Sequence, residues 1–146
     1  TAGKAIIEAM EKGDLSREGL WAYNIRYMQL YGASQASLDV FRLFFHGVGD
    51  DDLNYGMQHR LVTEEDLLKA IMGEEIHLNI TEATNRIFRG LGKLSLLKNL
   101  RDAANLMKKV REHYKNYPTS SQGFEEWKRK ARDLTEEAGK WRRSKK

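Results

Sequence analysis

The chain has 146 residues, of which 40% are hydrophobic and 32% charged, and its formal net charge is +4. This length is enough for one domain with a hydrophobic core, and because cysteine is absent, disulfides, thiolate metal sites and a cysteine nucleophile are excluded. No apolar run approaches the ~20 residues that span a bilayer, and no signal-peptide pattern opens the chain. We therefore expect a cytoplasmic protein that is at most peripheral to a membrane.

The charge is unevenly distributed along the chain. Residues 1–80 contain 7 Lys/Arg and 13 Asp/Glu, whereas residues 81–146 contain 18 and 8. An acidic half followed by a basic half indicates either that the halves pack on each other or that the basic half contacts phosphate. The phosphate would belong to a lipid headgroup or to nucleic acid.

Helix signals begin at the first residues. Residues 2–12 place small and apolar side chains on one face, and Gly13 stands where a C-terminal cap belongs. Because Thr1 is not a methionine and the helical pattern starts at once, we expect the chain to be part of a longer protein.

An aromatic stretch follows at residues 19–47 (GLWAYNIRYMQLYGASQASLDVFRLFFHG) and holds half of the fourteen aromatic residues. Its pattern predicts two helices, of which the first is capped by Asp14 or Ser16 and ends at Gly32. Helices this apolar must be surrounded, either by other helices or by an apolar ligand. The stretch is therefore either a core helix pair or one wall of a pocket for a long apolar molecule. Its aromatic residues are Trp21, Tyr23, Tyr27, Tyr31, Phe41, Phe44 and Phe45.

Helical patterns punctuated by glycine continue to the end of the chain. Residues 63–66 (TEED) form a capping box, whereas apolar and polar residues alternate over 76–80 and predict a few extended residues. The longest helical pattern starts at Ser95 and is followed by Pro118, and the last pattern starts at Phe124. Together these signals predict an all-α fold, an irregular domain of about seven or eight helices.

Metal-ligating patterns are incomplete. Residues 50–54 have the spacing of a calcium loop, but Tyr55 and Leu61 replace the glycine and the closing glutamate that the loop needs. Residues 74–77 form a single Glu-x-x-His, whereas di-iron bundles need two copies. We therefore predict no metal site, and we assign no catalytic residue.

Basic side chains gather in the second half without a zinc-finger or RNA-binding signature. They indicate either a solvated helix face or a phosphate-contacting surface, and the terminal WRRSKK is either a frayed tail or a contact with an anionic membrane surface. The clustered side chains are Arg86, Arg89, Lys93, Lys98, Arg101, Lys108, Lys109, Arg111 and Lys115.

Several segments resemble archaeal FAD-dependent geranylgeranyl reductases, in the region after their flavin-binding core. The likeness covers nearly the whole chain and weakens after Gln122. The segments are GKAIIEAMEKGDLSREGLWAYNIRYMQLYG, SLDVFRLFF, DDLNYGM, the helical pattern at 63–73, RGLGKLSLL and LMKKVREHYKNYP.

The resemblance implies a C-terminal helical part of a larger flavoprotein that saturates the isoprenoid chains of membrane lipid precursors. It places Thr1, Ala2 and Gly3 at a helix N-terminus that faces FAD in the parent protein, with no cofactor expected on this chain alone. It makes the seven aromatic residues of the stretch at 19–47 candidates for lipid contact, and the basic half a candidate for membrane contact. The flavin domain of the same polypeptide becomes a partner, and uncovered apolar surface predicts self-association of this part.

The implied organisation is the end of a flavin-domain helix (1–13), a helical domain (14–117), a linker (118–123) and a last helix with a basic tail (124–146). The alternative function is an independent helical module that binds an acidic partner or nucleic acid through its basic second half.

Overall fold

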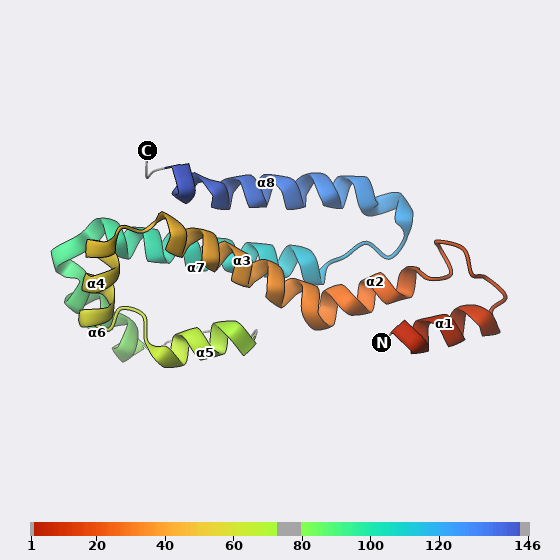
Figure 1. The fold of residues 1–146 in the computed structure, drawn as a ribbon, viewed down its shortest axis with the longest axis horizontal. Coiled ribbons are helices and arrows are strands. Elements are labelled where there is room, and N and C mark those ends of the chain that lie inside the picture. The colour runs from red at the N-terminus through yellow and green to blue at the C-terminus, as the bar shows by residue number, and fades with distance from the viewer. Residues whose placement is uncertain (1, 73–79, 144–146) are drawn as a thin grey trace.

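A computed structural model describes residues 2–72 and 80–143, and these residues form helices and turns without any strand (Figure 1). The predicted all-α fold is therefore confirmed. The helices are α1 (Ala2–Glu11), α2 (Trp21–Tyr27), α3 (Ala33–Gly47), α4 (Asp50–Gln58), α5 (Glu64–Met72), α6 (Ile80–Gly90), α7 (Leu94–Lys115) and α8 (Phe124–Arg143). Three short helical turns are η1 (Met28–Gly32), η2 (Leu91–Lys93) and η3 (Ser121–Gly123).

Helices α2 and α3 are one continuous helix, because the π-helical turn η1 joins them without a break. The prediction that Gly32 ends the first helix is thus wrong. A terminating glycine takes positive φ, as Gly13 does at 67°, whereas Gly32 has φ −59° and ψ −39°. Gly32 instead makes room for a neighbour, since a Cβ there would lie 2.5 Å from Sδ of Met28.

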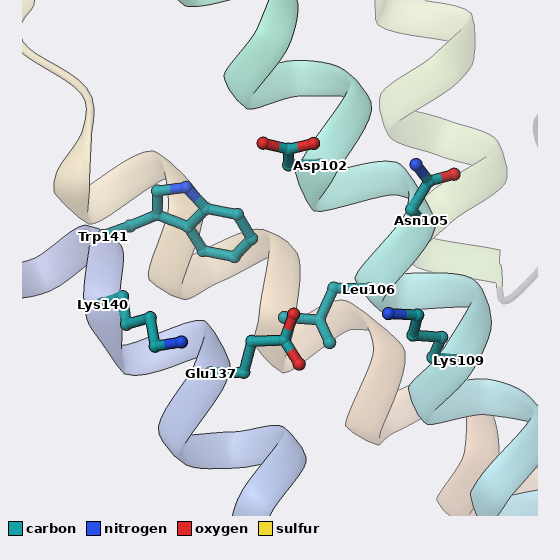
Figure 2. A pocket seen from close by; sticks show the side chains of 7 residues that line it. All are labelled: Asp102, Asn105, Leu106, Lys109, Glu137, Lys140 and Trp141. Carbon is teal, nitrogen blue, oxygen red and sulfur yellow. The ribbon is translucent and has the colours of Figure 1, made fainter.

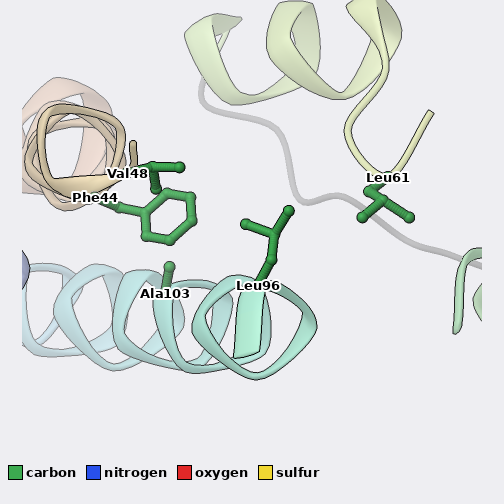
Figure 3. Packing of buried hydrophobic residues seen from close by; sticks show 5 residues of the cluster. All are labelled: Phe44, Val48, Leu61, Leu96 and Ala103. Atoms are coloured by element: carbon green, nitrogen blue, oxygen red, sulfur yellow. The ribbon is translucent and has the colours of Figure 1, made fainter. Parts of the chain in front are cut away.

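Helix α3 runs antiparallel to the long helix α7, and α8 packs against both (Figure 1). Phe44 of α3 and Val48, the residue after α3, meet Leu96 and Ala103 of α7 in the core, which Leu61 extends (Figure 3). A second buried cluster unites all three helices through Val40, Leu106, Val110 and Ala138. The apolar stripes seen in the sequence of α3, α7 and α8 therefore face one another.

Trp141 in the terminal WRRSKK segment is part of this packing. Its ring meets Phe44 edge-on, with centroids 5.6 Å apart, and its backbone lies directly against Gly47. Trp141 is therefore not part of a frayed tail, because α8 continues as a helix to Arg143, whereas contact of this segment with a membrane stays a prediction. Residues 144–146 lie outside the described part.

The predicted helix ends are partly confirmed. Thr63 N donates to Oδ2 of Asp66 at 2.8 Å and Asp66 N donates to Oγ1 of Thr63 at 3.3 Å, as a capping box requires. The predicted cap of the aromatic helix is wrong, because Leu20 occupies that position and Asp14 instead accepts a bond from Ser16 N. The predicted extended segment at 76–80 lies mostly outside the described residues, and its last residue already belongs to α6. The domain boundaries stay predictions.

Candidate functional site

The structure separates the aromatic residues that the sequence groups together. Trp21 is buried against Tyr117 and Phe124, with ring centroids 5.6 and 5.9 Å away, and its Nε1 donates to the carbonyl oxygen of Pro118 at 2.7 Å. Trp21 therefore fixes the connection between α7 and α8 to the start of α2. Phe44 is equally buried, in the core between α3 and α7.

Tyr23, Tyr27 and Tyr31 form a ladder along one side of α2 and η1. Successive ring centroids lie 6.0 Å apart from Tyr23 to Tyr27 and 5.9 Å apart from Tyr27 to Tyr31. Tyr23 is 37% exposed and Tyr31 52% exposed, so the ladder faces outward. It forms an aromatic surface rather than the wall of a cavity.

Phe41 of α3 borders an open apolar groove. The ring of Phe45 packs against the ring of Phe41, with centroids 4.5 Å apart. The groove has a cavity volume of about 540 Å³ and lies between α3, α6, α7 and the segment that leads into α5. Helix α7 supplies half of its lining. The apolar lining residues are Phe41, Leu61, Val62, Ala83, Ile87, Leu97, Leu100, Ala103, Ala104 and Met107, and the polar ones are Asp66, Arg86, Lys98 and Arg101.

A buried ion pair closes one wall of this groove. Arg86 donates to both carboxylate oxygens of Asp66, at 2.5 and 3.2 Å, and to the carbonyl oxygen of Leu61 at 3.2 Å. The two side chains are 17% and 7% exposed. Burial acts to raise the pKa of the Asp66 carboxyl, but the hydrogen bonds from Arg86 and Thr63 outweigh it and hold the pKa below its ordinary value. The pair joins α5 to α6 beside the groove.

Basic side chains predicted to face phosphate are partly engaged inside the fold. Arg86 is paired with Asp66, Lys93 is paired with Asp52 at 2.5 Å, and Arg111 is buried with 7% of its surface exposed. These three residues are therefore not part of an open phosphate-binding surface. Fewer basic side chains are therefore available to an acidic partner or nucleic acid than the alternative function assumes. Nothing else in the described residues supports that alternative.

A second cleft, of about 380 Å³, separates α7 from α8 (Figure 2). Two carboxylates and two ammonium groups balance one another in its lining, together with Asn105, Leu106 and the edge of Trp141. Its charged lining contrasts with the apolar groove and offers little surface to an apolar ligand. The four charged residues are Asp102, Lys109, Glu137 and Lys140.

The chain is 45% identical over 139 residues to digeranylgeranylglycerophospholipid reductase from Sulfolobus acidocaldarius, a match that includes 95% of this chain. The chain is homologous to part of this reductase. The predicted resemblance is thereby confirmed, although the chain spans only 31% of the Sulfolobus protein. No family model matches the chain.

The residues predicted to approach FAD are only partly described. Thr1 lies outside the described part, while Ala2 and Gly3 form the exposed first turn of α1, which carries no acidic side chain. One exposed helical turn is compatible with a negative group but is too little to hold a dinucleotide. We therefore derive no step of hydride chemistry from these residues, and their role stays a prediction.

Neither a membrane span nor a metal cluster occurs in the described part. None of its helices is both long and apolar enough to cross a bilayer. Within residues 2–72 and 80–143, no three His, Asp or Glu side chains gather where they could hold a metal ion. The Glu-x-x-His pattern at 74–77 lies outside the described residues.

Proposed function

We propose that this chain is the helical part of a flavin-dependent reductase that saturates isoprenoid chains of membrane lipid precursors, and that the groove between α3, α6 and α7 holds one such chain. Two observations support the proposal. The homologous Sulfolobus protein is named as a reductase of a digeranylgeranyl lipid, and the groove is open and lined mainly by aliphatic and aromatic side chains.

The groove suits an isoprenoid chain on physical grounds. Its volume lies within the range of roughly 300–1,000 Å³ that is usual for ligand pockets. Each Å² of apolar surface removed from water contributes about 25 cal/mol, and a chain in the groove would cover Phe41, Leu100 and Met107 as well as its own surface. Ten of its fourteen lining residues are apolar, so the groove can hold a ligand without functional groups.

The division of labour follows from which chemical groups the chain contains. We assign hydride transfer to FAD held by the remainder of the parent protein, because a flavin supplies the redox chemistry and the protein positions the substrate against it. The described helices contribute binding and orientation of the lipid chain. None of the described residues is assigned a catalytic role.

The proposal is tested by filling the groove. Ala104 lines it and is solvent-exposed, so Ala104→Trp can occupy the groove without entering the core. The adjacent Asn105 is also exposed but does not line the groove, which makes Asn105→Trp a matched control. Binding of a fluorescent geranylgeraniol analogue is measured by anisotropy. We expect at least tenfold weaker binding to Ala104→Trp and unchanged binding to Asn105→Trp.

Two further variants separate the groove from the aromatic surface. Phe41→Ala removes a groove wall, whereas Tyr31→Ala removes an exposed member of the tyrosine ladder. Weakening by Phe41→Ala alone supports the groove. Weakening by Tyr31→Ala alone, or equal binding by all variants, would refute the assignment of the lipid to the groove.

A further inference from the structure

We propose that Lys98 and Arg101 bind the anionic headgroup of a ligand whose isoprenoid chain lies in the groove. This inference rests on the proposed function and deepens it, because it names the residues that would hold the charged end of the lipid. It also gives the ligand a direction, with its charged end at the α7 border of the groove.

The charges around the groove do not balance. Four charged side chains line it, and two of them, Asp66 and Arg86, neutralise each other in a buried pair. Lys98 and Arg101 remain, and neither is joined to a carboxylate by an ion pair within the described residues. The groove border therefore carries two uncompensated positive charges.

The two cations are placed to act together. They are three residues apart on α7, so they are neighbours on the helix surface with Cβ atoms about 5–6 Å apart. Both are solvent-exposed and both border the groove next to Leu97 and Leu100. A guanidinium fork beside an ammonium group matches the oxygens of a phosphate, since arginine binds phosphate through two parallel hydrogen bonds.

Neighbouring acidic groups do not satisfy these cations. Asp102 lies four residues after Lys98 on the same helix, but it lines the α7–α8 cleft and forms no ion pair with Lys98. By contrast, Lys93, one helical turn before Leu97, forms an ion pair with Asp52. Its ammonium group also lies over the ring of Tyr55, 5.6 Å from the ring centroid. Lys93 is thus neutralised by Asp52, whereas Lys98 and Arg101 stay exposed beside the apolar groove.

An apolar groove bordered by the two cations Lys98 and Arg101 fits an amphiphile with one long chain and one anionic end. A neutral prenyl alcohol would contact only the groove, and a free phosphate would contact only the two cations. The chemistry common to both parts of the site is therefore that of a prenyl phosphate or a prenyl phospholipid.

The test uses the 146-residue chain and a double variant, Lys98→Gln with Arg101→Gln. Arg129→Gln with Arg132→Gln is the matched control, because these two residues have the same spacing, are exposed and lie on α8 away from the groove. The probes are geranylgeranyl monophosphate, geranylgeraniol and inorganic phosphate, each competing with the fluorescent analogue at low and high salt.

We expect the monophosphate to bind about tenfold more tightly than the alcohol, a preference that salt weakens because the cations are exposed. The Lys98/Arg101 variant should lose this preference and keep its affinity for the alcohol, while the Arg129/Arg132 variant should keep both. Inorganic phosphate should not displace the analogue at the concentrations where the monophosphate does.

The outcomes distinguish this inference from the proposed function. If the alcohol and the monophosphate bind equally, or if the Lys98/Arg101 variant keeps the preference, the headgroup assignment is overturned while the groove stands. Loss of the preference in the Arg129/Arg132 control would also overturn it, because the attraction would then come from overall charge. If neither prenyl probe binds, both proposals fail. Displacement by inorganic phosphate alone would identify free phosphate as the ligand and contradict the lipid assignment.

Discussion

The Asp66–Arg86 pair provides a quantitative test of how burial sets the contribution of an ion pair to stability. We consider Asp66→Asn, which preserves the size of the side chain and a capping oxygen but removes the negative charge. The carboxylate of Asp66 accepts two bonds from Arg86 and one from Thr63, and the two ionic side chains are only 7% and 17% exposed. The substitution would remove the carboxylate that neutralises the largely buried Arg86 guanidinium.

The expected loss follows from this burial. Removing one partner of a buried ion pair costs about 3–5 kcal/mol, because the remaining charge stays desolvated without compensation. Asp66→Asn is therefore expected to lower the free energy of unfolding by about 3 kcal/mol, near the lower end of that range, since the asparagine oxygen still accepts bonds from Arg86 and Thr63.

An exposed pair of the same residue types serves as the control. Arg42 donates to Asp39 at 2.8 Å, but these side chains are 57% and 65% exposed, so Asp39→Asn should cost at most about 1 kcal/mol. Urea denaturation of the two variants and the parent chain, followed by far-UV circular dichroism, gives the comparison. If the two variants lose equal stability, burial of the Asp66–Arg86 pair does not govern its contribution and the reasoning fails.

Two further predictions concern pH and helix packing. Because the pKa of Asp66 is lowered in the folded state, its contribution to stability is present above the unfolded pKa of about 3.9 and is lost as pH falls through the folded value. Between neutral pH and pH below ~4, the free energy of unfolding should therefore fall less in Asp66→Asn than in the parent chain. Gly47→Ala should destabilise by about 1–3 kcal/mol, because its Cβ would lie 2.5 Å from the carbonyl oxygen of Trp141. Gly56→Ala, whose Cβ would meet only Leu96 at 3.7 Å, should instead stabilise by about 0.5–1 kcal/mol in urea denaturation, and the opposite order would contradict this account.

Local signals were the part of the fold that the sequence predicted well. The capping box at Thr63 and Asp66 needs only residues three positions apart, and the stop at Gly13 needs only one residue that tolerates positive φ. The apolar stripes of α7 and α8 likewise follow from helical spacing alone. These features depend on neighbours in the chain, so one sequence contains the information to find them.

The groove could not be found in this way, because its parts come from distant segments. Phe41 and Met107 border the same space although 66 positions separate them, and Arg86 reaches Asp66 across 20 positions. In the sequence Arg86 was one member of a basic cluster, and only its contact with Asp66 distinguishes it from Lys98. The difference between a cation paired inside the fold and one left exposed therefore depends on tertiary pairing, which periodicity does not reveal.

The aromatic stretch shows how a single local feature redirects side chains. In an uninterrupted α-helix each residue turns by about 100°, so Phe41, fourteen positions after Tyr27, would lie within roughly 40° of it and share its face. The π-helical turn Met28–Gly32 inserts about one residue without advancing the rotation, which moves Phe41 to roughly 140° from Tyr27. The tyrosine ladder accordingly faces outward while Phe41 borders the groove. If the π turn directs the tyrosines and Phe41 to different faces, deletion of one residue from it, such as Gln29, should turn Phe41 out of the groove. Prenyl binding should then weaken as it does in Phe41→Ala. Unchanged binding would show that packing on α7 alone directs Phe41.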